Sequence, residues 1–430
     1  MPHTIKGSGP DSIKAEAFFF PLLKSGTRSR PAETIGASPG WISGLAAALV
    51  WCFSATGIHA QGIPAPAVVA APERPTPAPL YVAASLKERP TGVAVSKSGR
   101  VFVCFPNWSA THTISVAELK PGQDPVPYPD AVWNAPGNAR GDPQHSFVCV
   151  QSVYVDNNDN LWALDPAAPN LGTVVPGGPK LVELDLKSNT IKRVYAFDDD
   201  DAPARSYLND VRVDPAGHFA YISESGIGAI LVVDLQSGKT RRVLDHVPET
   251  LGTNGIVITV GGHELRGPSG MAFTINCDGI ALSPDGTTLY FEAPTNGNMY
   301  SIATADLRDT GLNDQALEKR LKLIANIGPA DGFSTGPDGQ IYVTGVEDHC
   351  IRRVNIGETP LLTVVVDDPR LNWPDSMAWS QDGGLYITAS QIPRMPRFNG
   401  GQDLAQLPYQ LFRCRPLAPT ESMLDVPASP

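Results

Sequence analysis

Six polar residues stand at one position of a repeated pattern, each just before a short apolar segment. The pattern is a polar residue, a small or polar one, the apolar segment, a turn rich in Gly, Asp and Asn, and a second segment that contains an aromatic residue. The copy that begins at Asn276 reads NCDGIALSPDGTTLYFE. Across the six copies the aligned polar residue is Thr91, Gln151, Asn209, Asp278, Asp331 and Asp375.

Three of these residues are carboxylates, and Asp210 adds another one residue after Asn209. A single Asp or Asn before a strand is explained by an Asx turn, in which the side chain bonds its own backbone two residues on. Carboxylates that converge on one point repel and desolvate each other unless a cation or a shared proton compensates. We therefore expect the six aligned residues to form a ligand-binding ring. A polar ring without function is the alternative.

The same residues suggest a metal. Carboxylate and amide oxygens are hard ligands that suit Ca²⁺ or Mg²⁺. The sequence thus predicts a divalent cation, such as Ca²⁺, on Asn209, Asp278 and Asp331. No organic cofactor is implied.

The spacing of the copies indicates what positions these residues. Successive copies begin 60, 58, 69, 53 and 44 residues apart, at Arg89, Cys149, Tyr207, Asn276, Pro329 and Trp373. Each interval can hold four strands with their loops, and radial repetition of four-stranded sheets leaves only short edges. We predict an all-β protein, a six-bladed β-propeller over residues 81–415, in which the first strand of each blade lines a central channel. A β-sandwich or β-helix is the competing interpretation.

Composition agrees with a turn-rich β protein, because the 430 residues include 40 Gly and 41 Pro. The net charge of -11 speaks against a nucleic-acid partner, which needs a basic face. Beyond residue 60 no C-x-x-C pair occurs, so a thiolate zinc site is not expected, and at most two disulfides can form. The five cysteines there are Cys104, Cys149, Cys277, Cys350 and Cys414.

The N-terminal residues are typical of an exported protein. Residues 1–60 contain the uncharged apolar run Trp41–Gly57, which is followed by a candidate cleavage position after Ala60. This pattern predicts that residues 1–60 are an export signal and leader. Residues 61–80 form a Pro/Ala-rich linker and residues 416–430 a flexible C-terminal tail. We expect a periplasmic or secreted protein without a membrane span in the mature chain. A retained anchor is the alternative, because the run is near the short limit of a span.

Several motifs together resemble the major royal jelly protein/Yellow family. They include NNDNLWALDPA, YLNDVRVDPAGHFAYISESG and DGIALSPDGTTLYFEAPTNG, and the resemblance extends over about Glu88 to Arg415. It implies a secreted six-bladed propeller with a small-molecule pocket at the channel mouth. Insect members of this family are associated with dopachrome conversion or biogenic-amine binding. Glu292 stands where some relatives have a His, so dopachrome chemistry does not transfer directly.

A more distant similarity is to the SMP-30/gluconolactonase-like propellers, in which Asn and Asp at inner-strand starts help to hold a divalent cation that polarises a lactone. YLNDVRVDPAGHF resembles their Asn-Asp motif at Asn209 and Asp210, and PADGFSTGPDG resembles their Asp-Gly motif at Asp331. Thr91 departs from the pattern, because a Glu ligand is expected there. Asp375 is a candidate to supply the missing charge.

Three functions follow as hypotheses. The first is a lactonase-like hydrolase or an isomerase of small cyclic substrates, in which the cation acts as a Lewis acid. The second is a non-catalytic small-molecule binding protein for an amine-type cation, with Trp108, Trp162 or Phe333 as an aromatic wall. The third is a protein-interaction platform with no ligand in the channel. The candidate catalytic bases are Asp210, Asp375 and His145.

Overall fold

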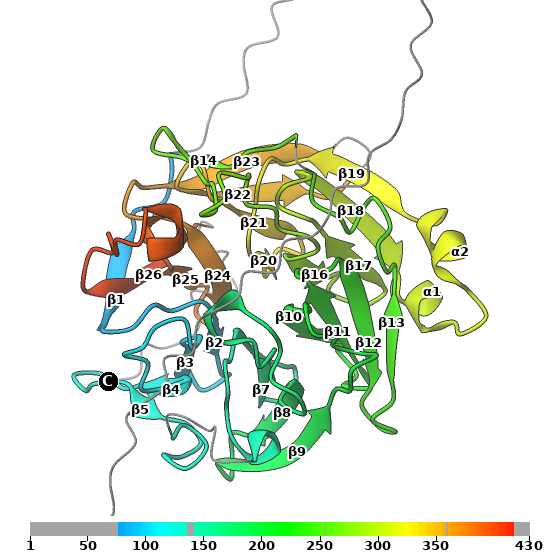
Figure 1. Ribbon diagram of the computed structural model, residues 1–430, viewed down its shortest axis with the longest axis horizontal. Coiled ribbons are helices and arrows are strands. Elements are labelled where there is room, and N and C mark those ends of the chain that lie inside the picture. Colours follow the sequence, from blue (N-terminus) through cyan, green and yellow to red (C-terminus); the bar gives the residue numbers. More distant parts are fainter. Residues whose placement is uncertain (1–75, 136–141, 254, 358–359, 417–430) are drawn as a thin grey trace, which may run out of the picture. The chain divides into compact units, whose positions relative to one another are not determined.

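Six four-stranded antiparallel sheets are arranged around a central channel (Figure 1). The computed structural model describes residues 76–135, 142–253, 255–357 and 360–416. The predicted six-bladed β-propeller is confirmed. The export signal and leader, residues 61–75 of the linker and residues 417–430 of the tail lie outside the described residues, so these remain predictions.

In five blades the strand order in the sheet follows the order in the chain. Blade 1 consists of β2 (Val93–Val95), β3 (Val101–Cys104), β4 (Val116–Leu119) and β5 (Val126–Pro127); blade 2 of β6 (Ser152–Val155), β7 (Asn160–Asp165), β8 (Lys180–Asp185) and β9 (Thr190–Ala196); and blade 3 of β10 (Leu208–Val213), β11 (Phe219–Glu224), β12 (Ala229–Asp234) and β13 (Thr240–Val243). Blade 4 consists of β16 (Ile280–Leu282), β17 (Thr288–Phe291), β18 (Asn298–Ala303) and β19 (Lys322–Asn326), and blade 5 of β20 (Phe333–Thr335), β21 (Ile341–Gly345), β22 (Cys350–Asn355) and β23 (Leu361–Asp367).

Blade 6 closes the ring by joining the two ends of the folded chain. It consists of β24 (Pro374–Trp379), β25 (Leu385–Ala389), β26 (Tyr409–Cys414) and, as its outer strand, β1 (Tyr81–Leu86). β1 pairs antiparallel with β26, with Leu86 opposite Tyr409, and Figure 1 shows the two strands side by side. The inner strands β2, β6, β10, β16, β20 and β24 each contact the next around the axis, and β24 contacts β2.

The hydrophobic core lies between neighbouring blades. Trp162 of β7, for example, packs in one buried cluster with Leu208 and Ile222 of blade 3. Because each sheet is covered on both faces, its middle strands are apolar almost throughout, as in AILVVD of β12. Burying that apolar surface is the main force that holds the blades together, at about 25 cal/mol per Å².

The hairpin turns between first and second strands depend on local backbone chemistry. In the SPDG turn of blade 4, the Gly286 amide donates to the Ser283 carbonyl at 2.8 Å. Gly286 has a φ of 71°, in the left-handed region that glycine adopts without strain. A Cβ there would also lie 2.4 Å from the Pro215 ring of the neighbouring blade. The repeated Gly therefore fits both the turn and the blade spacing.

Outside the blades the regular elements are short. They are the hairpin β14 (Thr259–Val260) and β15 (His263–Glu264), the helices α1 (Thr304–Arg308) and α2 (Asp314–Glu318), and the 3₁₀ turns η1 (Pro143–His145), η2 (Pro169–Leu171), η3 (Ile392–Arg394) and η4 (Pro396–Phe398). Within the described ranges, none of these helices has the length and apolar character needed to cross a membrane.

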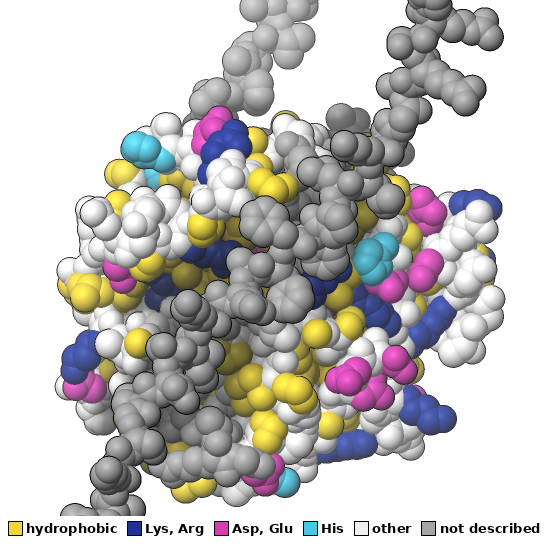
Figure 2. All heavy atoms as spheres, in the orientation of Figure 1, with side chains coloured by type: hydrophobic (Ala, Val, Ile, Leu, Met, Phe, Trp, Pro, Cys, Tyr) yellow, Lys and Arg dark blue, Asp and Glu magenta, His cyan; other side chains and the backbone are white. Residues whose placement is uncertain are grey.

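The five cysteines of the described chain are all buried free thiols, so the disulfides that the sequence allows do not form among them. On the part of one face that the described residues form, acidic and basic side chains are interspersed (Figure 2).

Candidate binding site at the channel mouth

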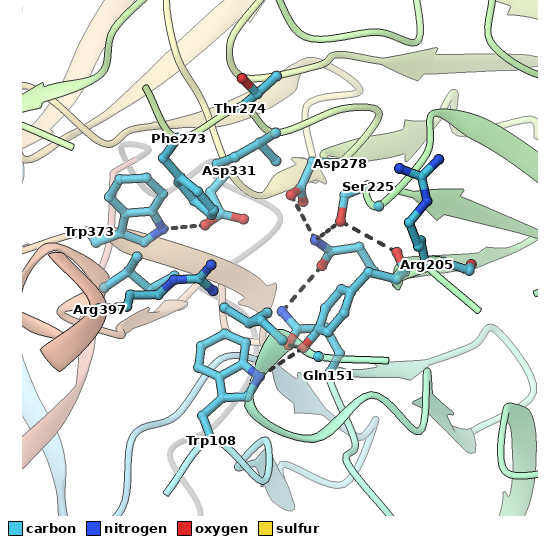
Figure 3. A pocket seen from close by; sticks show the side chains of 18 residues that line it. Trp108, Gln151, Arg205, Ser225, Phe273, Thr274, Asp278, Asp331, Trp373 and Arg397 are labelled. Atoms are coloured by element: carbon cyan, nitrogen blue, oxygen red, sulfur yellow. Dashed lines mark hydrogen bonds between the residues drawn. The ribbon is translucent and has the colours of Figure 1, made fainter. Parts of the chain in front are cut away.

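One mouth of the channel holds a cavity of about 230 Å³ (Figure 3). Its polar residues include Gln151, Asn209, Asp278 and Asp331, which come from the starts of four inner strands. Its aromatic residues are Trp108, Tyr207, Phe273 and Trp373, and two arginines, Arg205 and Arg397, also line it. The cavity therefore combines a carboxylate-containing polar region with aromatic and cationic side chains.

The six aligned residues of the repeat are brought together around the axis, and all are between 0% and 8% exposed. The Thr91 hydroxyl donates to the Gln151 carbonyl at 2.7 Å, and the Gln151 side-chain amide donates to Asn209 Oδ1 at 3.2 Å. The Asn209 amide then donates to Asp278 Oδ2 at 2.7 Å. Hydrogen bonds thus connect the residues from blade 1 to blade 4. Asp278 and Asp331 lie close enough for one carboxyl, when protonated, to hydrogen-bond the other.

Asp278 and Asp331 have strongly perturbed acidities. Burial, followed by the nearby carboxylates of Asp331, Asp210 and Asp375, raises the pKa of Asp278 well above its usual value. Burial also raises the pKa of Asp331 to about 7, against the opposing hydrogen bond from the Trp373 indole. Two carboxyls in hydrogen-bond contact titrate as a pair. We infer that they hold a shared proton near neutral pH.

Thr91 and Asp375 complete the ring but are not among the described residues that line the cavity. Burial, then the neighbouring Asp331 carboxylate, raises the pKa of Asp375 well above its usual value. Its Oδ2 is buried and, among the described residues, has no hydrogen-bond partner. The Thr91 carbonyl accepts a hydrogen bond of 2.7 Å from the Thr388 hydroxyl of blade 6. The bond between Thr388 and Thr91 thus joins the last blade to the first.

The other two predicted bases lie outside the cavity. Asp210 accepts a hydrogen bond of 2.8 Å from Ser152 and forms a buried ion pair of 3.1 Å with Arg212. His145 is on the surface in η1, where its Nδ1 lies 2.8 Å from Asp142 Oδ2. The structure therefore does not bring either side chain to the mouth.

Of the three predicted aromatic residues, only Trp108 lines the cavity. Its indole donates to the Tyr207 hydroxyl at 3.0 Å, and that hydroxyl donates to Gln151 Oε1 at 2.8 Å. Trp162 and Phe333 instead belong to the cores between blades. The aromatic part of the cavity is thus tied to its polar part through Tyr207.

The prediction missed two aromatic residues of the cavity, Tyr207 and Trp373, which each stand two positions before a ring residue, Asn209 and Asp375. Strand alternation does not mark this position, because Trp373 has a φ of 59° and lies just before β24. The residues at the same offset in blades 4 and 5, Asn276 and Pro329, are not among the described residues that line the cavity. Phe273 and Arg397 come from long loops, between β15 and β16 and between β25 and β26. No repeat position marks them.

Two glutamates near the mouth differ in their surroundings. Glu224 is fully buried, accepts backbone amides from Tyr207, Gly226, Ile227 and Gly228, and pairs with Arg242 at 2.8 Å. It therefore shapes the turn after β11, from which Ser225 reaches Asn209. Glu292 is also fully buried, and neither of its oxygens makes a hydrogen bond of normal geometry in the described chain. Burial raises the pKa of Glu292 well above its usual value, despite the opposing influence of the Ala330 amide and Arg352.

The donor set only partly fits the predicted divalent cation. Asp278 and Asp331 offer two carboxyls, but the Asn209 side-chain oxygen already accepts from Gln151. The described residues contain no group of three or more His, Cys, Asp or Glu side chains arranged to hold a metal ion. Calcium takes six to eight oxygens, so most ligands would have to be water. A cation on these residues remains a prediction.

A family model described as major royal jelly protein matches residues 148–415. No curated protein matches the chain. Among solved structures, it is similar to a virginiamycin B lyase from Staphylococcus aureus, with 14% identity over 72% of this chain and 82% of that one, at a TM-score of 0.42. A gluconolactonase from Xanthomonas campestris has 13% identity over 79% of this chain and 89% of that one, at a TM-score of 0.45. A luciferin-regenerating enzyme has 11% identity over 78% of this chain and 95% of that one, at a TM-score of 0.46.

Proposed function

Because the chain belongs to the major royal jelly protein family, whose model matches residues 148–415, we propose that the channel mouth binds a small organic molecule with a basic amino group. The observation that carries this proposal is the Asp278–Asp331 pair in a cavity lined by Trp108, Tyr207 and Trp373. The biogenic-amine binding associated with insect members of this family agrees with it.

A buried carboxyl pair favours a cation physically. Two carboxylates removed from water are costly to ionise together, and here a shared proton relieves the repulsion between Asp278 and Asp331. An ammonium group can replace that proton, because it brings a full positive charge and up to three hydrogen-bond donors. The carboxyl pair therefore supplies the charge selectivity of the proposed site.

The aromatic residues suit the remainder of the same ligand. Indole and phenol faces attract organic cations by about 0.5–2 kcal/mol each and bury apolar rings. The cavity, at about 230 Å³, is below the ~300–1,000 Å³ of typical ligand pockets. The proposed ligand is therefore small, on the scale of an alkylamine that carries a single aromatic ring.

The direct test is calorimetric titration of the protein with tyramine at pH 7.5. We expect saturable binding that Asp278→Asn and Asp331→Asn each weaken by at least about tenfold, since each removes a charge-assisted contact. Asp199→Asn, in an exposed loop, is the matched control for loss of one carboxylate. Equal tyramine affinity in all four proteins would contradict an amine site on the carboxyl pair.

The second candidate is acid–base catalysis on a small cyclic substrate, either lactone hydrolysis or isomerisation. It is favoured by the pKa of about 7 for Asp331, since a pair that carries one proton has an acid and a base together at neutral pH. In this role one carboxyl would take a proton from water or substrate while the other donates one to a leaving or carbonyl oxygen. Turnover of a lactone panel that Asp278→Asn abolishes would support it. Tyramine binding without any turnover of the panel favours the first proposal.

The predicted divalent cation can be tested by competition with the proposed ligand. If Ca²⁺ binds Asn209, Asp278 and Asp331, it should compete with tyramine, because both ligands need the same two carboxyls. Calorimetric titration with CaCl₂, with and without saturating tyramine, measures this. Calcium binding that tyramine leaves unchanged would place the cation elsewhere.

A further inference from the structure

Arg397 presents a positive charge to the cavity on the side of Trp373 and Trp108 (Figure 3). It lies in η4, within the loop that joins β25 to β26 in blade 6. In Figure 3 its guanidinium points toward the centre of the cavity, whereas that of Arg205 lies at the opposite edge beside Ser225. Arg397 is half-buried, and Arg205 is exposed.

The guanidinium of Arg397 is held by stacking and has no counter-charge. Its central carbon lies 5.3 Å from the Phe273 ring centroid and 5.5 Å from that of Phe398. These two rings pack edge to face at 5.0 Å. In the described chain Arg397 forms neither an ion pair nor a side-chain hydrogen bond, although its five N–H groups are all donors.

Two other arginines that are largely buried have a carboxylate partner. Arg212 pairs with Asp210 at 3.1 Å, and Arg242 pairs with Glu224 at 2.8 Å. A half-buried guanidinium loses hydration, and a carboxylate compensates for it best by accepting two parallel hydrogen bonds. Arg397 lacks such a partner among the described residues, and its guanidinium points toward the centre of the cavity (Figure 3).

The loop around Arg397 is fixed by its own hydrogen bonds. The Asn399 side-chain amide donates to the Pro393 carbonyl at 2.8 Å and to the Met395 carbonyl at 2.9 Å. The Gly401 amide donates to the Pro396 carbonyl at 2.8 Å. Because loop and guanidinium are already ordered, little conformational freedom is left to lose when an anion binds.

We propose that Arg397 binds a carboxylate of the ligand, so that the natural ligand is a zwitterion with an aromatic ring, an amino group and an acid group rather than a simple amine. This inference rests on the proposed function, because the amino group is assigned to Asp278 and Asp331. The opposite charges of the two anchors then fix the direction in which the ligand lies. They also exclude a ligand that carries the wrong charge at either end.

The test uses two probe pairs that differ only by a carboxylate. Tyrosine is compared with tyramine, and 4-(aminomethyl)benzoate with benzylamine, by calorimetry on the full chain at pH 7.5. The two pairs place the carboxylate at different distances from the amine, because the structure does not prescribe that separation. We expect at least one zwitterion to bind about tenfold or more tightly than its amine partner. In Arg397→Gln this advantage disappears, because each zwitterion loses the contact that distinguishes it from its amine partner.

Arg394→Gln is the matched control. Arg394 lies in the same loop, carries the same charge and hydrogen-bonds to Gln391 at 2.9 Å, but it is outside the set of described residues that line the cavity. This variant should keep the preference for the zwitterion. Arg397→Lys keeps the charge but loses the two-pronged donor geometry, so it should retain only part of the preference.

The outcomes separate the two proposals. If neither zwitterion binds more tightly than its amine, or if Arg397→Gln leaves the preference intact, the carboxylate anchor is wrong while the amine site stands. If no probe with an amino group binds at all, the proposed function itself fails. If 3-(4-hydroxyphenyl)propionate, which has an acid but no amine, binds as tightly as tyrosine, the acid anchor stands and the amine site fails.

Discussion

At the scale of single residues, the site depends on neighbours that set the charge of two carboxyls. Asp331 is the clearest case. Burial raises its pKa to about 7, and the hydrogen bond from the Trp373 indole opposes that rise. Trp373 therefore has two roles, as an aromatic surface of the cavity and as the donor that keeps Asp331 partly ionised near neutral pH. Removal of the indole N–H should change the ionisation of Asp331 more than it changes the aromatic surface of the cavity.

Trp373→Phe tests this relation. Phe keeps an aromatic ring but has no N–H, so the anionic form of Asp331 loses a hydrogen bond and its pKa should rise by up to about one unit. Tyramine affinity in the wild-type protein should increase as pH rises from 5 through about 7, because a cation binds the ionised pair. In Trp373→Phe the midpoint of that increase should move to higher pH.

The pH profile is measured by calorimetry in steps of half a pH unit. Tyr207→Phe, which removes a polar group from the same cavity without touching Asp331, is the comparison variant. A midpoint that is the same in Trp373→Phe and the wild type would show that the indole does not control the carboxyl pair.

At the scale of elements, the ring is narrow because small residues follow the aligned positions. A Cβ added to Gly332, at the start of blade 5, would lie 2.0 Å from the Asp375 carbonyl oxygen of blade 6. A Cβ on Gly279 would lie 2.4 Å from the Asp331 carbonyl oxygen. Both contacts are with backbone, which cannot move aside without shifting an inner strand. These glycines allow neighbouring inner strands to approach closely enough for the carboxyls of the ring to raise each other's pKa.

Gly332→Ala should therefore destabilise the protein, by about 1–3 kcal/mol, as overpacking does in other cores. Thermal unfolding followed by circular dichroism measures this. Gly357→Ala is the control, because a Cβ there meets no atom within 4 Å. Similar unfolding temperatures for the two variants would mean that the strand approach at Gly332 is not tight.

The elements that the sequence could predict are those that local features define. The six copies of the repeat predicted the blades, the inner strands and the ring residues, because hairpin turns and strand starts are local features with a fixed spacing. Phe273 and Arg397 escaped prediction because they reach the cavity from long loops whose path depends on packing across blades. Trp162 was assigned to the mouth, but it lies in the core between blades 2 and 3 and its indole donates to Asp156. Its strand position alone does not distinguish the channel from a blade face.

At the scale of the whole molecule, buried carboxyls couple the site to stability. Asp278, Asp331 and Asp375 all have folded-state pKa values raised above the unfolded value of 3.8, chiefly by burial. Between that value and about 7 the folded protein binds protons that the unfolded chain does not. Stability from these groups is therefore fully present below the unfolded pKa and is lost as pH rises through the folded one. As far as these three groups contribute, the protein is thus less stable at pH 8 than at pH 5.

Asp375→Asn is expected to reverse part of that loss. The variant keeps the size of the side chain but does not ionise, so its free energy of unfolding relative to wild type should rise between pH 5 and pH 8, by roughly a kcal/mol or more. Urea unfolding at the two pH values measures the difference. An advantage for the variant that is larger at pH 5 than at pH 8 would contradict the raised pKa of Asp375.

Closure of the ring by β1 and β26 also has a consequence for how the protein is made. The blade that joins the two ends of the folded chain is the blade that carries Trp373, Asp375 and Arg397. A ribosome that stops before residue 409 releases a chain in which β1 has no strand to pair with and the Arg397 loop has no closing strand. A chain that lacks β26 should therefore lose the proposed ligand binding at the mouth as well as stability, because blade 6 positions three residues of the site.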